Sequence, residues 1–293
     1  MGEGIEGRPV VVGVDDADES RDAATLGYRI ADASNAPLHL VTAVYDPLVD
    51  IAIGRLGFDA DAAREALTKQ ALQTVRDSLR TAVPAPALQD RLAVRIGRAE
   101  HVLAEYGREV GAGLVVIGGK ARSGVGSWLG RGTAHHLLRT TGSPLLVAGP
   151  GALEIGRVLV ALDLSQESLR TLRLATSLAG LLKVELRAVH VVDDTVARMH
   201  RAFDPEQVLA DGKARAREEI WPLLSPETSR DLLVGPVTES LSRVSRERGP
   251  SLLVLGSHGL GRVSRWLLGS TTEELLSGLP TSLAIVPSAQ DWV

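Results

Sequence analysis

Glycines at a fixed spacing near the end of the chain could hold a phosphate group. Two residues separate Gly256 from Gly259, nine separate Gly259 from Gly269-Ser270, and the apolar run Leu252–Leu255 comes directly before them. Glycine lets backbone N–H groups approach an anion closely, and a helix N-terminus adds unpaired donors and partial positive charge. The spacing predicts a phosphate cradle at the carboxyl end of a strand, where open α/β sheets bind ligands.

Other segments of the chain occur twice. Val10–Asp15 recurs 148 residues later as Val158–Asp163, and Leu114–Gly118 recurs 138 residues later as Leu252–Gly256. The order of the elements is kept, so we expect two copies of one domain, at 1–150 and 151–293, joined near Gly149-Pro150-Gly151. A repeat this long indicates a duplicated globular domain and not a solenoid unit.

Composition limits the class of protein. The 293 residues are 44% hydrophobic, which is enough apolar material for two cores, and the net charge of −4 argues against a nucleic-acid binder. Cysteine is absent, which excludes disulfides and thiolate metal sites. No apolar run approaches the length of a membrane span, and the N-terminus lacks a signal-peptide pattern. We expect a cytoplasmic protein without a membrane or nucleic-acid partner.

Apolar strands alternate with helical segments in both copies. The strands are expected at 9–15, 38–45, 88–95, 114–118 and 144–148, and again at 157–163, 184–192, 231–234, 251–256 and 282–286. The helices are expected at 18–34, 59–82, 99–111 and 133–141, and again at 167–182, 204–224, 238–248 and 270–277. The helix at 59–82 should end before Pro84 and Pro86, and residues 47–58 and 194–203 should be loops. This alternation predicts a parallel sheet covered on both faces.

The Gly-x2-Gly-x9-Gly-Ser loop, Asp163 and the duplicated α/β pattern together resemble the universal stress protein family in its tandem form. The resemblance covers residues 8–288. It implies two Rossmann-like (adenine nucleotide alpha hydrolase-like) domains, each with a five-stranded parallel sheet of order 3-2-1-4-5 flanked by helices. It also implies ATP, with or without Mg²⁺, at the switch point of the sheet.

The resemblance also assigns roles within the second copy. Asp163 would accept a hydrogen bond from the exocyclic amine of adenine, and Val191 would pack against the base. Gly256, His258 and Gly259 would line the ribose and phosphate side. Gly269, Ser270 and Thr271 would present N–H groups and hydroxyls to the phosphates.

In the first copy the matching residues are Asp15, Ala43, Gly118, Gly132 and Thr133, and this copy departs from the pattern. Ala121 replaces the second glycine, and Arg131 falls where Gly269 stands. Gly132-Thr133 could serve as the Gly-Ser pair if the loop is one residue longer. We expect weaker nucleotide binding here, with a purely structural role as the alternative.

Each of these residue types also has a plain structural explanation. Asp15 and Asp163 could cap the helices that follow them. Gly256 and Gly259 could be turn glycines, and Ser270 could be only an N-cap. His190 is expected to be a packed strand histidine.

The chain has no Walker phosphate loop, nucleophile elbow or zinc-binding His-Glu-x-x-His pair. Binding is therefore favoured over turnover. The leading hypothesis is an ATP-binding stress-response or regulatory protein whose nucleotide occupancy changes its conformation or its binding of an unknown protein partner. The alternatives are a slow ATPase or adenylyl-transferring enzyme, and an interaction protein whose sites stay empty. We also expect the two copies to pair through Leu145–Ala148 and Leu283–Val286, and a homodimer of such chains stays open.

Overall fold

The computed structural model describes residues 5, 7–45, 59–119, 131–165, 167–199, 204–247, 249–259 and 268–288. The chain divides into two compact units, Ile5–Ala148 and a second that begins at Gly149, and each has its own fold. Within the described ranges, no helix is long and apolar enough to cross a membrane.

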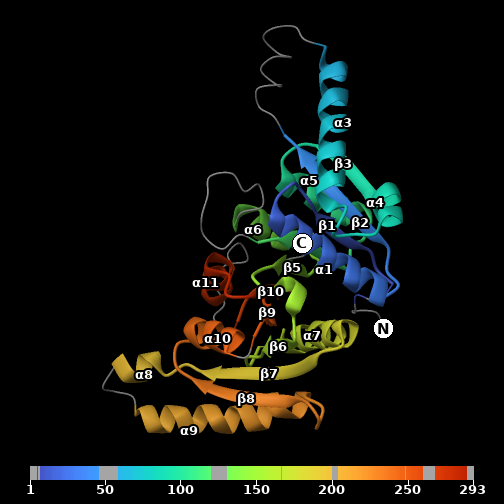
Figure 1. Cartoon of the computed structure of the whole chain (residues 1–293). Helices are drawn as coiled ribbons and strands as arrows, with labels where there is room; N and C mark the ends of the chain where they lie inside the picture. The colour runs from blue at the N-terminus through green and yellow to red at the C-terminus, as the bar shows by residue number, and fades with distance from the viewer. Residues whose placement is uncertain are drawn as a thin grey trace. The chain divides into compact units, whose positions relative to one another are not determined.

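The first unit is a parallel sheet of order β3-β2-β1-β4-β5 with helices around it (Figure 1). Its strands are β1 Val10–Gly13, β2 Leu38–Val44, β3 Leu92–Ile96, β4 Leu114–Gly118 and β5 Leu145–Ala148. Its helices are α1 Asp18–Ala33, α3 Ala60–Leu79, α4 Ala85–Arg91, α5 Ala99–Glu109 and α6 Arg131–Thr140. Every residue of β1 and β4 is buried. Since successive side chains of a strand point to opposite faces, both faces of this sheet are covered.

The second unit repeats this arrangement as β8-β7-β6-β9-β10. Its strands are β6 Arg157–Ala161, β7 Glu185–Val192, β8 Ser229–Val234, β9 Leu252–Gly256 and β10 Ser282–Val286. Its helices are α7 Ser168–Leu182, α8 Thr195–Met199, α9 Pro205–Arg215, α10 Val237–Arg246 and α11 Ser270–Gly278. Numbered within each unit, both sheets have the order 3-2-1-4-5, which confirms the predicted fold class.

One predicted strand was wrong over half its length. Residues 88–91 belong to α4, and β3 begins only at Leu92. Pro84 is the N-cap of α4 and Pro86 lies in its first turn, where a backbone N–H has no intrahelical acceptor and proline is tolerated. The two prolines therefore lie at the start of α4 as well as after the end of α3.

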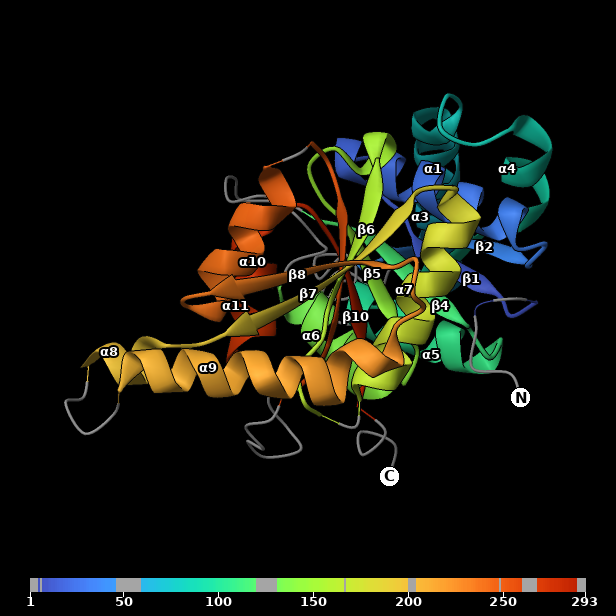
Figure 2. The ribbon, with the colours of Figure 1, turned by 90° about the horizontal axis from the view of Figure 1, so that it is seen from below.

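Two further expectations changed in the second unit. Residues 195–199 form α8 inside a predicted loop, while residues 46–58 and 200–203 lie outside the described ranges. The helix predicted at 204–224 is α9, then a π-helical segment at Ala216–Ile220 and a 3₁₀ turn at Trp221–Leu223. No residue of α9 is buried, although α9 lies beside β7 and β8 in both ribbon views (Figures 1 and 2). Burial resumes at Ala216 and Ile220.

Candidate functional site

A cavity of about 900 Å³ lies in the second unit, at the carboxyl ends of β6, β7 and β9. β6 pairs with β7 on one side and with β9 on the other, so this is the switch point of the sheet. The cavity is lined by all eight residues that the sequence assigned to the second copy: Asp163, Val191, Gly256, His258, Gly259, Gly269, Ser270 and Thr271. The fold thus brings the chain after β6, the end of β7 and the two ends of the glycine loop together.

Helices α9 and α10 supply cavity residues that were not predicted from the sequence, as α7 does with Ser168 and Thr171. Val208, Asp211, Gly212 and Arg215 of α9 line one wall, and Val237 and Leu241 of α10 line another. The four α9 residues follow an i, i+3, i+4, i+7 spacing, which places them on one face of a helix. This spacing is the signal in the sequence that groups these four residues on one helix face.

Asp163 turns its two carboxylate oxygens to different surroundings. Oδ1 accepts the N–H of Ser165 at 3.0 Å and the hydroxyl of Ser165 at 2.5 Å, and the Ser168 hydroxyl lies 3.0 Å away. Oδ2 faces Gly259, because a Cβ added to that glycine would lie 2.9 Å from it. Among the described residues no group donates to Oδ2, so this oxygen can accept a hydrogen bond from a ligand.

Helix capping does not explain the two aspartates. The N-cap residues of α1 and α7 are Ala17 and Glu167, and neither helix has a side-chain cap. Asp15 instead accepts the N–H of Ala17 at 3.0 Å, as Asp163 does with Ser165. Both aspartates therefore shape the turn that follows their strand.

Hydrogen bonds bring the two ends of the glycine loop together. The N–H of Gly269 donates to the Ser257 carbonyl at 2.9 Å, and the buried Thr272 hydroxyl donates to the Gly256 carbonyl at 3.0 Å. Gly269 is the N-cap of α11 and brings no side-chain cap, and Ser270 is the first residue of the helix. Donors of this first turn have no intrahelical acceptor, so they are available to an anion. Residues 260–267 lie outside the described ranges.

The two cavity histidines make contacts with the chain. His190 is buried, and its Nδ1 lies 2.8 Å from the Leu162 carbonyl, so this nitrogen carries the proton and donates. His190 therefore holds β7 to the residue that follows β6, in agreement with the expectation of a packed strand histidine. His258 Nδ1 lies 3.0 Å from the Ser257 hydroxyl.

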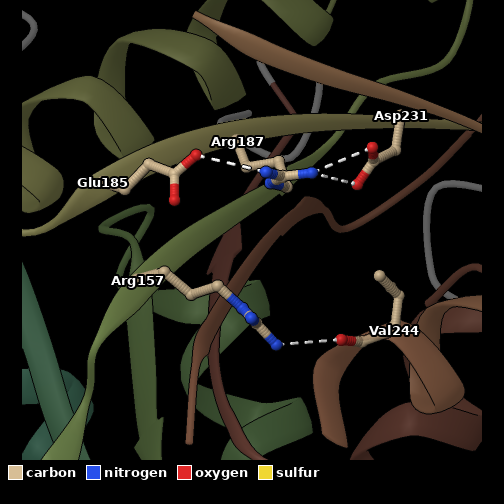
Figure 3. Close-up of polar contacts among 5 residues, drawn as sticks. All are labelled: Arg157, Glu185, Arg187, Asp231 and Val244. Atoms are coloured by element: carbon tan, nitrogen blue, oxygen red, sulfur yellow. Dashed lines mark hydrogen bonds and ion pairs between the residues drawn. The ribbon is translucent and has the colours of Figure 1, made fainter. Parts of the chain in front are cut away.

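Charged residues fix β7 beside β8. Arg187 donates to both carboxylate oxygens of Asp231, at 3.0 and 2.9 Å, and lies 3.4 Å from Glu185 (Figure 3). The hydrogen bond to Asp231 is the main cause that raises the pKa of Arg187. Buried Arg157 donates to the Val244 carbonyl of α10 at 3.2 Å. Arg187 is two residues before Val189, which lines the cavity, so the ion pair anchors the strand that forms its floor.

In the first unit Asp15 and Ala43 line a cavity of about 30 Å³. Gly118 has a packing explanation, because a Cβ there would lie 2.6 Å from the Glu19 carbonyl oxygen of α1. Gly132 is exposed and Thr133 is buried within α6. Ala121 lies outside the described residues.

α6 and α11 are the equivalent helices of the two copies, and their sequences align without a gap. Leu137 and Leu275 are 138 residues apart and both are buried. This register places Gly132 at the position of Ser270, not at that of Gly269, and Thr133 at the position of Thr271.

Comparison with known proteins decides the family. The family model described as the universal stress protein family matches residues 7–149 and again residues 154–287. The chain belongs to the universal stress protein family. The two matches make it a tandem member, as the glycine loop and the duplication predicted.

Relatives of this universal stress protein include full-length and half-length matches. Universal stress protein Rv2005c of Mycobacterium tuberculosis H37Rv is 26% identical over 278 residues, which is 91% of this chain and 92% of that protein. Universal stress protein Slr1230 of Synechocystis is 29% identical over 142 residues, 48% of this chain and 46% of that protein, so the match spans about half its length. A universal stress protein from Archaeoglobus fulgidus DSM 4304 shares the fold, with a TM-score of 0.62 and 16% identity over 99% of this chain and 100% of that one.

Proposed function

We propose that this universal stress protein binds ATP in the cavity of its second unit and that nucleotide occupancy regulates its conformation or its binding of a protein partner. The main support is that Asp163, Val191 and the ends of the glycine loop line one cavity of about 900 Å³. Cavities of roughly 300–1,000 Å³ suit ligands of drug size, a class that includes a nucleotide.

Two sets of groups in the cavity suit a nucleotide. The first turn of α11 and the glycine loop offer N–H donors to phosphates. Oδ2 of Asp163, beside Gly259, is an acceptor for the exocyclic amine of adenine, and Val191 offers apolar surface to the base. The uncapped helix end favours a polyanion through its partial positive charge.

A weaker site in the first unit stays a prediction. It rests on Asp15, Ala43, Gly118, Gly132 and Thr133. Pairing of the two units, a homodimer and a cytoplasmic location are likewise predictions. Size-exclusion chromatography with light scattering tests the homodimer, and cell fractionation tests the location.

Isothermal titration with ATP, with and without MgCl₂, tests the function. Asp163→Ala should weaken the tighter site about ten-fold or more, since one hydrogen bond to a charged group is worth roughly 1.5–3 kcal/mol. The matched variant Asp15→Ala in the first unit should leave that site unchanged. Phosphate release in the same samples separates binding from slow hydrolysis.

Two results would contradict the proposal. Wild-type protein that shows no binding at millimolar ATP would exclude nucleotide binding. Equal affinities of the wild type and Asp163→Ala would place the nucleotide elsewhere on the chain.

A further inference from the structure

We propose that Ser165 is a positioning residue of the second site, which fixes the Asp163 carboxylate so that Oδ2 selects an amino group over a carbonyl oxygen on the bound purine. The inference rests on the proposed function and goes beyond it, because it assigns base selectivity to a residue outside the glycine loop.

Ser165 is the residue that saturates Oδ1. Its N–H and its hydroxyl both donate to this oxygen, at 3.0 and 2.5 Å. Ser168 has a single hydroxyl proton and two acceptors within reach, the Asp163 carbonyl at 2.7 Å and Oδ1 at 3.0 Å. The shorter contact takes the proton of Ser168 to the main chain, so the hydroxyl of Ser165 holds the carboxylate.

The first unit orients its aspartate differently. There the Ser20 hydroxyl donates to Oδ1 of Asp15 at 2.5 Å, and the N–H of Ala17 donates to the same oxygen at 3.0 Å. Ala17 stands where Ser165 stands and has no hydroxyl. The two units therefore divide the same task between different serines, and alanine at this position is compatible with the turn.

Fixing Oδ1 has a consequence for the ligand. Oδ2, beside Gly259, is the oxygen left to face the cavity. A carboxylate oxygen only accepts hydrogen bonds, so a purine with a 6-amino group gains a bond there. A purine with a 6-oxo group instead brings one acceptor against another. A carboxylate free to rotate would discriminate less.

Titrations with ATP and with inosine triphosphate, which has the 6-oxo group, test this role. Wild-type protein should prefer ATP, and Ser165→Ala should lower the ratio of the two affinities about ten-fold through weaker ATP binding. Ser165→Thr retains a hydroxyl and should restore the ratio. The matched control is Thr176→Ala, which removes an exposed hydroxyl of α7 that donates only to the Leu172 carbonyl, and it should leave the ratio unchanged.

A merely structural role for Ser165 would weaken both nucleotides equally and keep the ratio, and this result would overturn the inference alone. The inference also fails alone if wild-type protein binds both nucleotides with the same affinity. Wild-type protein that binds neither nucleotide would overturn the proposed function, and this inference with it.

Discussion

Replacing Gly259 by alanine should weaken ATP binding while leaving the fold intact. A Cβ at this position would lie 2.9 Å from Oδ2 of Asp163, which is 0.5 Å inside the 3.4 Å at which ordinary contacts begin. The backbone of Gly259 is not in the left-handed region, so alanine fits the main chain. The expected effect therefore comes from the methyl group alone.

The size of the effect follows from this contact. Inserting a methyl group into a closely packed site costs roughly 1–3 kcal/mol, which corresponds to an affinity loss of roughly 5- to 150-fold if all of it falls on the bound state. The methyl group must displace Oδ2 from the position in which it would accept a hydrogen bond from the adenine amine. Gly180→Ala in α7 is the control, because nothing lies within 4 Å of a Cβ at that exposed helical position and Gly180 does not line the cavity.

Isothermal titration in two backgrounds makes the test specific. In Asp163→Gly protein the clash is absent, so the added Gly259→Ala should change the affinity for ATP little. A wild-type affinity in Gly259→Ala protein would refute the assigned position of Oδ2. The same loss in both backgrounds would show that the effect does not pass through Asp163.

Three other predictions concern stability. Asp231→Asn should lower the free energy of unfolding, measured by urea denaturation, by about 2 kcal/mol. This loss lies between the values for exposed and buried ion pairs, because the side chain of its partner Arg187 is only 19% exposed. Burial is the main cause that lowers the pKa of His136 from 6.5, so the unfolded chain binds the proton more readily than the folded chain. The free energy of unfolding should therefore fall as the pH drops through about 6.5. His136→Gln should flatten this pH dependence, and an unchanged pH profile would refute the prediction. Thr272→Val should lower the free energy of unfolding, measured in a thermal melt, by about 1 kcal/mol and should weaken ATP binding, because the Gly256 carbonyl loses its buried donor. Wild-type stability together with wild-type affinity would exclude a role of this hydrogen bond in shaping the loop.

The fold was predictable because its signals are local and repeated. Runs such as Val10–Val12 and Leu252–Leu255 have no polar residue, as expected of strands buried on both faces. The segment after Pro84 was not predictable at the same level. Its short apolar residues suit a helix or a strand, and the choice of α4 depends on packing against β2 and β3.

The candidate site was predictable where it lies on strand ends. Asp163 lies two residues after the end of β6 and Gly256 ends the neighbouring parallel strand β9, so their proximity follows from the topology alone. The spacing of the α9 residues indicates that they share one face of a helix, but the place of that face beside the cavity was not predictable, because it depends on how the chain after β7 returns to the sheet. The role of Ser165 was equally hidden, since it depends on which of two serines gives its proton to the main chain.

α9 forms one side of the cavity but buries none of its own residues. Its inward face, from Val208 to Arg215, packs closely on Val192 of β7 at Gly212 and also lines the cavity. A molecule in the cavity would therefore add to the limited packing that this helix obtains from the protein. Amide hydrogen exchange along this helix should slow when the cavity is filled, whereas the buried amides of Ala216 and Ile220, next along the chain, give an internal standard. Equal exchange of α9 with and without nucleotide would show that its order does not depend on the ligand.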